Sequence, residues 1–225
     1  IPTTPTTEAG YTVKDVVRIP DDTPKDGKIR KGGTVTFTVV PDSNKVFNQL
    51  KVGNIDCLST PSTGDVTAVR EGNGYRITIP NVAGEINLTA TAIEFQVIKN
   101  ELTQVPEGLT EKYATPEAMK SALRTQISPS VSGSNIKYLD IKLKINTGSV
   151  WQDVTADNFP KGGINITILY TNLGNGLDNS YNYSVAHMRA DGIIENLSAT
   201  NGEDGITFHV NSLSPFAIGW YKNTP

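Results

Sequence analysis

Short runs of alternating apolar and polar residues fill most of this chain and predict β-strands. The clearest runs span residues 34–39, 75–79, 86–92, 139–145 and 164–168. Alternation with a period of two places the apolar side chains of an extended strand on one face and the polar ones on the other. Turn residues rich in glycine and asparagine separate many of the runs. This pattern is typical of antiparallel β-sandwiches in which each sheet turns one face toward water.

The final run, Pro215–Tyr221, differs from the others because it is apolar on both faces. A strand of this kind is covered on both sides, so we expect it at the centre of a sheet. Two further strands are predicted around Tyr183–Met188 and Gly205–Val210.

One segment has a helical period instead. Thr115 is a good N-cap, Pro116 fits the first helical position, and Met119, Leu123 and Ile127 recur at intervals of four. These signals predict a single α-helix over about 115–127. A helix of about three turns is not stable alone, so we expect it to pack on the sheet that follows.

The pattern divides the chain into three parts, with a boundary near Ile93–Glu94. Residues 1–10 are a Thr/Pro-rich tract, predicted to be an extended linker. Residues 11–93 predict an Ig-like β-sandwich. Residues 94–225 predict a second, different β-sandwich decorated with the one helix. The fold class is therefore mainly β, and because no initiating Met is present we expect an excerpt of a longer protein.

Composition and charge narrow the class of partner. The net charge is −3, and no run of Lys or Arg and no membrane-length apolar segment occurs. We therefore expect neither nucleic-acid binding nor membrane insertion. The single cysteine, Cys57, excludes an intramolecular disulfide. If residues 55–58 are extended, Cys57 shares a face with Ile55, which predicts a buried structural thiol.

The second half contains six distinctive phrases. In chain order they are Val105-Pro106-Glu107-Gly108-Leu109, Trp151-Gln152-Asp153-Val154-Thr155, Asn158-Phe159-Pro160-Lys161-Gly162-Gly163, Val185-Ala186-His187-Met188, Asp191-Gly192-Ile193-Ile194-Glu195 and Ser212-Leu213-Ser214-Pro215-Phe216-Ala217-Ile218-Gly219-Trp220. In this order and spacing they resemble a module of large, multi-domain surface proteins of anaerobic gut Firmicutes. The resemblance covers about residues 95–223, and residues 11–93 resemble a generic bacterial Ig-like repeat.

The resemblance implies a cell-surface stalk or adhesin-type role without a known reaction. In related modules a loop containing Tyr-Pro often follows the strand after the Asn-Phe-Pro phrase. Here the corresponding loop, residues 170–180, is rich in Gly and Asn and has no proline. A role of that loop in recognition is therefore not carried over to this chain.

Few residues could support catalysis or hold a metal or cofactor, and we expect none to do so. His209 falls on the polar face of its strand, and His187 shares a face with Val185 and Tyr183, which predicts a satisfied, buried or half-buried ring. Self-cleavage after His187 would need a Ser or Thr nucleophile next to it, and the sequence continues with Met188-Arg189.

Carboxylates occur in turn-like settings rather than as a catalytic pair. They are Asp21-Asp22, Asp191 with Glu195, and Glu203-Asp204. Calcium could use Asp42-Ser43-Asn44 or Asp178-Asn179, but neither has the ligand density of a dedicated loop.

Exposed aromatic side chains are the remaining candidates for ligand binding. Trp151 with Gln152 and Asp153, or Tyr181 and Tyr183 among their asparagines, could stack on a sugar while polar neighbours bind its edge. The alternative, which the sequence favours for Trp151 and for Trp220, is packing in a core or at its rim.

These observations predict a non-enzymatic structural or adhesion module of a larger secreted bacterial protein, attached to the cell surface or cell wall. The alternative is a carbohydrate-binding module of a protein that captures or degrades glycans. The expected partners are neighbouring modules of the same chain and an unidentified host or bacterial surface ligand, a glycan among the candidates.

Overall fold

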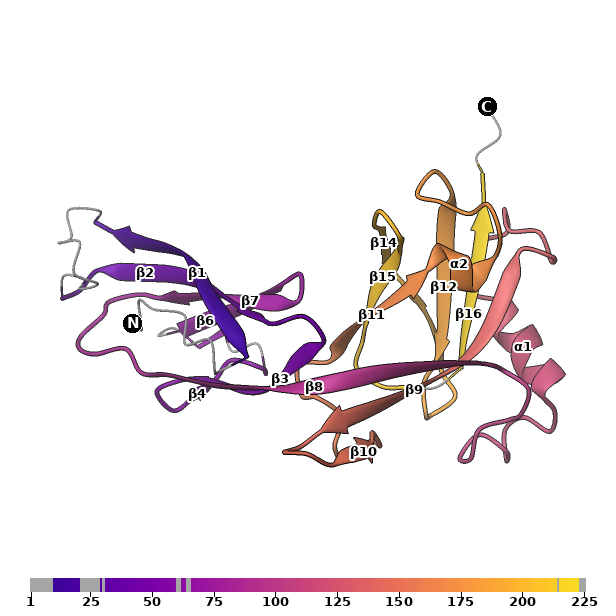
Figure 1. Ribbon diagram of the computed structural model, residues 1–225, viewed down its shortest axis with the longest axis horizontal. Helices are drawn as coiled ribbons and strands as arrows, with labels where there is room; N and C mark the ends of the chain where they lie inside the picture. Colours follow the sequence, from indigo (N-terminus) through magenta and orange to yellow (C-terminus); the bar gives the residue numbers. More distant parts are fainter. Residues whose placement is uncertain are drawn as a thin grey trace. The chain divides into compact units, whose positions relative to one another are not determined.

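The computed structural model describes residues 10–20, 29, 31–59, 62, 63, 66–213 and 215–222 (Figure 1). Its fold is mainly β, with several antiparallel sheets and two helices among the described residues, so the predicted fold class is confirmed. The described residues form two compact units. Unit 1 comprises the chain up to Phe95 together with residues 145–152 and 160–162, and unit 2 comprises the remainder. The predicted linker, apart from Gly10, lies outside the described residues.

Unit 1 is a sandwich of two antiparallel layers. One layer has the strand order β1-β2-β7-β6-β5, and the other contains β4, β3 and the first part of β8. The bounds of these strands are β1 Tyr11–Ile19, β2 Thr34–Pro41, β3 Lys45–Val52, β4 Ile55–Asp56, β5 Ser62–Thr63, β6 Val66–Glu71, β7 Gly74–Ile79 and β8 Leu88–Glu101.

The core of unit 1 lies between these layers and follows the predicted alternation. Val35, Phe37 and Val39 of β2 are fully buried, and Phe47 and Leu50 of β3 belong to the same cluster. Their threonine neighbours in β2 point the other way, where Thr36 Oγ1 lies 3.1 Å from Thr78 Oγ1 of β7. Burying apolar side chains in this way is the main stabilising contribution to such a sandwich.

Unit 2 is a second sandwich with a helical layer. Its larger layer has the order β13-β12-β16-β9-β8, and β11, β15 and β14 form the smaller one. The bounds are β9 Ile136–Asn146, β10 Trp151–Asp153, β11 Ile164–Leu169, β12 Asn182–Met188, β13 Ile194–Leu197, β14 Ala199–Asn201, β15 Gly205–Val210 and β16 Pro215–Tyr221. Strand β16, which is apolar on both faces, lies between β12 and β9, so its predicted central position is confirmed.

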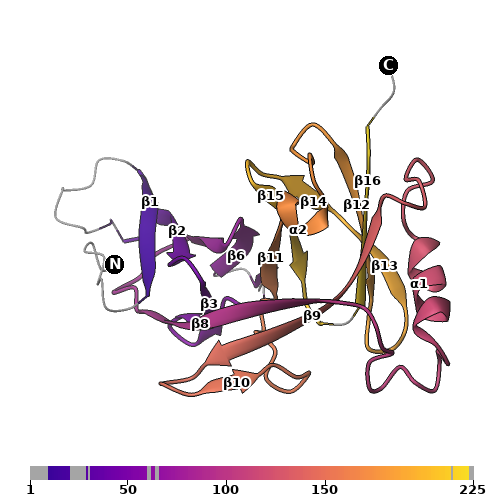
Figure 2. The ribbon, with the colours of Figure 1, turned by 45° about the vertical axis from the view of Figure 1, so that its right-hand side comes forward.

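Helix α1 (Pro116–Arg124) covers the face of β12 and β16 that is turned away from the smaller layer (Figure 2). Thr115 caps it through a bond from Ala118 N to Thr115 Oγ1 of 3.2 Å, and Met119 and Leu123 are fully buried against the sheet. The predicted helix is thus confirmed, although regular helix ends at Arg124 and Ile127 is buried from the turn that follows. A second, four-residue helix, α2 (Tyr170–Leu173), was not predicted.

The region around the predicted boundary differs from expectation in one respect. The run at 86–92 predicted a strand that ends before the boundary near Ile93–Glu94, but β8 is one strand of 14 residues that passes from unit 1 into unit 2. Strand β9 also passes from one unit into the other, because residues 145–152 belong to unit 1. An unbroken strand has no turn residue to mark a boundary, so the pattern of alternation could not indicate this arrangement.

Candidate functional site

Strands β9 and β10 form a tight antiparallel hairpin. Thr147 N donates to Val150 O (3.2 Å) and Val154 N to Leu143 O (2.9 Å), which fixes the register and leaves Gly148 and Ser149 as a two-residue loop. Both loop residues have positive φ, 88° and 101°, as a two-residue hairpin loop of type I′ requires. This register places Trp151 directly opposite Asn146.

Trp151 is 44% exposed, which rules out burial in a core; a position at the rim, the other form of the predicted packing, is compatible with this exposure. Its cross-strand neighbour Asn146 makes two bonds that hold the surface around the indole. Ser149 N donates to Asn146 Oδ1 (2.9 Å), and Asn146 Nδ2 donates to Glu94 Oε2 on β8 (3.1 Å). An indole, an amide and a carboxylate therefore form a row across β10, β9 and β8. We call this row, Trp151, Asn146 and Glu94, the Trp151 platform.

The other two predicted residues of this segment separate. Side chains alternate along a strand, so Gln152 points to the face opposite that of Trp151. Asp153 is on the same face as Trp151, but its Oδ1 lies 3.5 Å from Lys144 Nζ. Gln152 therefore cannot bind the edge of a ligand stacked on Trp151, and this part of the prediction is wrong.

Sequence reasoning missed Asn146 and Glu94. Neither residue is near Trp151 in a local motif, and Glu94 is 52 residues from Asn146 along the chain. The sequence signal for Asn146 is the predicted hairpin. Turn residues at Gly148 and Ser149 between two strand-like segments imply that the residues on either side of the loop face each other.

Tyr181 and Tyr183 lie in unit 2 and are held by internal contacts. The Tyr183 ring stacks on Tyr170 at 5.3 Å between centroids, and its hydroxyl donates to Asp178 O at 2.9 Å. Burial raises the pKa of Tyr183, with further increases from the neighbouring Tyr170 and Asp178. Lys222 Nζ lies 4.5 Å from the centre of the Tyr181 ring. Each ring thus has one face occupied, which makes this pair a poorer stacking surface than Trp151.

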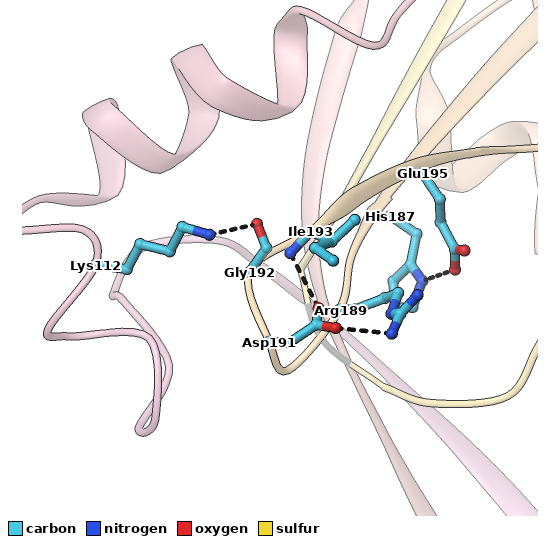
Figure 3. Close-up of polar contacts among 7 residues, drawn as sticks. All are labelled: Lys112, His187, Arg189, Asp191, Gly192, Ile193 and Glu195. Carbon is cyan, nitrogen blue, oxygen red and sulfur yellow. Dashed lines mark hydrogen bonds and ion pairs between the residues drawn. The ribbon is translucent and has the colours of Figure 1, made fainter.

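His187 of β12 is fully buried, and its ring lies beside the Glu195 side chain of β13 (Figure 3). Its Nδ1 lies 2.8 Å from Glu195 Oε1, and its ring stacks on Phe216 with 4.5 Å between centroids. Burial lowers the pKa of His187; hydrogen bonding to Glu195 opposes this, and Arg189 adds to it. The prediction of a satisfied core histidine is confirmed, and the contacts point to a structural role.

The turn between β12 and β13 is held by polar groups of its own and by Lys112 (Figure 3). Arg189 Nη2 lies 2.7 Å from Asp191 Oδ2, Ile193 N donates to Asp191 Oδ1 at 3.0 Å, and Lys112 Nζ donates to Gly192 O at 3.1 Å. Asp191 therefore stabilises a turn, as its sequence context predicted.

The other candidate polar groups also stabilise local structure. His209 lies on the polar side of β15, with Nδ1 2.8 Å from Asn165 Oδ1. Asp178 accepts hydrogen bonds from the backbone N–H and hydroxyl of Ser180, which lower its pKa. Cys57 is buried as predicted, and burial raises the pKa of its thiol to about 11. Within the described part of the chain, no group of three or more His, Cys, Asp or Glu residues is arranged to hold a metal ion. Asp21-Asp22 lies outside the described residues.

A surface hollow of about 270 Å³ in unit 2 brings carboxylates from different strands together. Asp140 of β9, Asp153 of β10 and Glu107 contribute to its lining. Asp140 pairs with Lys142 at 3.6 Å and Asp153 with Lys144 at 3.5 Å. Two of the three carboxylates in this hollow are therefore each paired with a lysine of β9.

No helix within the described ranges is long and apolar enough to span a membrane. Comparisons of the chain with protein-family models, with curated proteins and with solved structures found no match.

Proposed function

We propose that the chain is a non-enzymatic adhesion module of a larger bacterial cell-surface protein, and that it contacts its ligand through the hairpin that carries Trp151. The exposure of Trp151 is the observation that carries this proposal. A large aromatic side chain gains most by being buried, and a surface-exposed Trp is typical of a contact residue.

The surroundings of Trp151 support a contact role in a second way. The strand that carries the indole is fixed by the two-residue loop, by the bond from Ser149 N to Asn146 Oδ1 and by the backbone bonds of the hairpin. A hairpin backbone that is already ordered loses little conformational entropy when a ligand binds, so more of the interaction energy becomes affinity. The apolar core of unit 1 supplies the scaffold for this surface.

The proposal is tested by binding fluorescently labelled protein to intact epithelial cells and to bacterial cells, measured by flow cytometry. The wild-type protein is expected to bind one of the two cell types, and Trp151→Ala is expected to bind at least about five-fold more weakly. Val69→Ala is the matched control, because Val69 is another exposed apolar residue of unit 1, at 63% exposure. Equal binding of wild type and Trp151→Ala, or binding of the wild type no better than an unrelated carrier protein, would refute the proposal.

A further inference from the structure

We propose that the Trp151 platform binds a neutral glycan of at least two pyranose units. This inference rests on the proposed function and names the chemical class of its ligand. It depends on the composition of the platform and on the spacing of its three side chains.

The composition of the platform matches a sugar ring. One face of a pyranose carries C–H groups that stack on an indole, and the hydroxyl groups at its edge need hydrogen-bond partners. Trp151 offers the exposed ring. Asn146 uses its Oδ1 for Ser149 and one N–H for Glu94, so its second amide hydrogen remains available for a hydroxyl. The Glu94 carboxylate has further lone pairs, and Glu94 is exposed.

The spacing of the platform sets a minimum length for the ligand. Trp151 and Glu94 lie on β10 and β8, with β9 between them. Two strand spacings amount to about 9.6 Å, which a single sugar ring stacked on Trp151 does not span. A ring on Trp151 therefore leaves Glu94 to bind a second, linked ring.

The charge of the platform favours a neutral sugar over an acidic one. Glu94 brings a negative charge to the row, and the chain has a net charge of −3. Lys144 precedes Asn146 by two residues on β9, and Lys45 is paired with Glu94 in the β3–β8 register. Lys144 pairs with Asp153. The side chain of Lys45 extends toward Gly10, so its amine lies close to the Gly10 backbone. A uronate or sialate on this surface would be repelled by Glu94.

The test uses isothermal titration calorimetry with a panel of neutral tetrasaccharides, namely cellotetraose, mannotetraose and β-1,4-galactotetraose, and with tetragalacturonate as the acidic probe. We expect at least one neutral probe to bind and to shift the indole N–H resonance of Trp151 in a ¹H–¹⁵N spectrum. Tetragalacturonate is expected to bind at least about five-fold more weakly than the best neutral probe.

Three variants separate what the Trp151 ring and the Glu94 charge contribute to glycan binding. Trp151→Ala should weaken binding of the neutral probe about ten-fold or more. Glu94→Gln keeps the shape and hydrogen-bonding capacity but removes the charge, so it should narrow the difference between neutral and acidic probes. Gln152→Ala is the matched control on the opposite face of the same strand and should bind as the wild type does.

The glycan inference is overturned if no neutral probe binds, if Trp151→Ala binds as tightly as the wild type, or if tetragalacturonate binds as well as the neutral probes. Loss of cell binding in Trp151→Ala without any glycan binding would refute the glycan inference alone and leave the adhesion proposal standing. If the wild-type protein binds neither cells nor glycans, both the adhesion proposal and the glycan inference are refuted.

Discussion

Truncating Leu123 to alanine tests whether helix α1 is an integral part of the core of unit 2. Leu123 is fully buried on the sheet side of the helix, in a cluster with Met119, Ala186, Met188 and Ala217. Removing three carbon groups forfeits about 2.4 kcal/mol of transfer free energy at about 0.8 kcal/mol each. The cavity left behind adds to this, because the alanines below it lie on the central strands β12 and β16 and cannot collapse into the space. The expected loss is about 3–5 kcal/mol.

Urea unfolding followed by the fluorescence of Trp220 measures this loss, because Trp220 lies on β16 in unit 2. The chain has two tryptophans, so a Trp151→Phe background leaves Trp220 as the single reporter. With a slope of about 2 kcal/mol per molar urea, the midpoint should fall by about 1.5–2.5 M. Ser121→Ala, an exposed position on the same helix, is the control and should change stability by less than about 0.5 kcal/mol. A loss below about 1 kcal/mol for Leu123→Ala would refute the assignment of α1 to the core.

Two further predictions concern unit 2. Because the pKa of His187 is lowered from its usual 6.5, the unfolded state binds a proton at this residue more readily than the folded state does. The stability that the neutral, buried His187 contributes is therefore complete above about pH 6.5. It is lost as the pH falls from there toward the folded-state pKa. The free energy of unfolding should decrease by up to about 1.4 kcal/mol per pH unit in that window. His187→Gln should lack that decrease, and an identical pH profile in both proteins would contradict the assignment. Thr115→Ala should lower the free energy of unfolding by about 0.5–2 kcal/mol, because the hydrogen bond from Ala118 N is lost. Thr115→Ser keeps a hydroxyl at this position and should retain most of the stability. Equal urea midpoints for the two variants would show that the cap contributes nothing.

The candidate site was only partly predictable. The residue type and the polar neighbours of Trp151 predict a candidate contact residue, but they do not determine how much of its indole is exposed. A Trp at the start of a short strand has no alternation on its N-terminal side, where Gly148 and Ser149 form the loop, so the pattern could not say which face it occupies. Gln152 is adjacent to Trp151 in sequence, but adjacent side chains along a strand lie on opposite faces of the sheet.

The sequence by itself determined the local structure of this protein. Alternation with period two identified most of the strands and their buried faces, the doubly apolar run at Pro215–Tyr221 identified the central strand, and Thr115 with Pro116 located the start of the helix. These features depend on neighbours within a few residues, where backbone geometry alone relates one side chain to the next.

Only the tertiary structure decided which strands become neighbours, and the Trp151 platform depends on that choice. Glu94 meets Asn146 across 52 residues of chain because β8 and β9 are adjacent in one sheet, and His187 meets Glu195 and Phe216 through the register of β12 with β13 and β16. Pairing between distant strands is set by how all the apolar faces can be buried together, and a one-residue change in register would reverse every face. No local pattern contains that information.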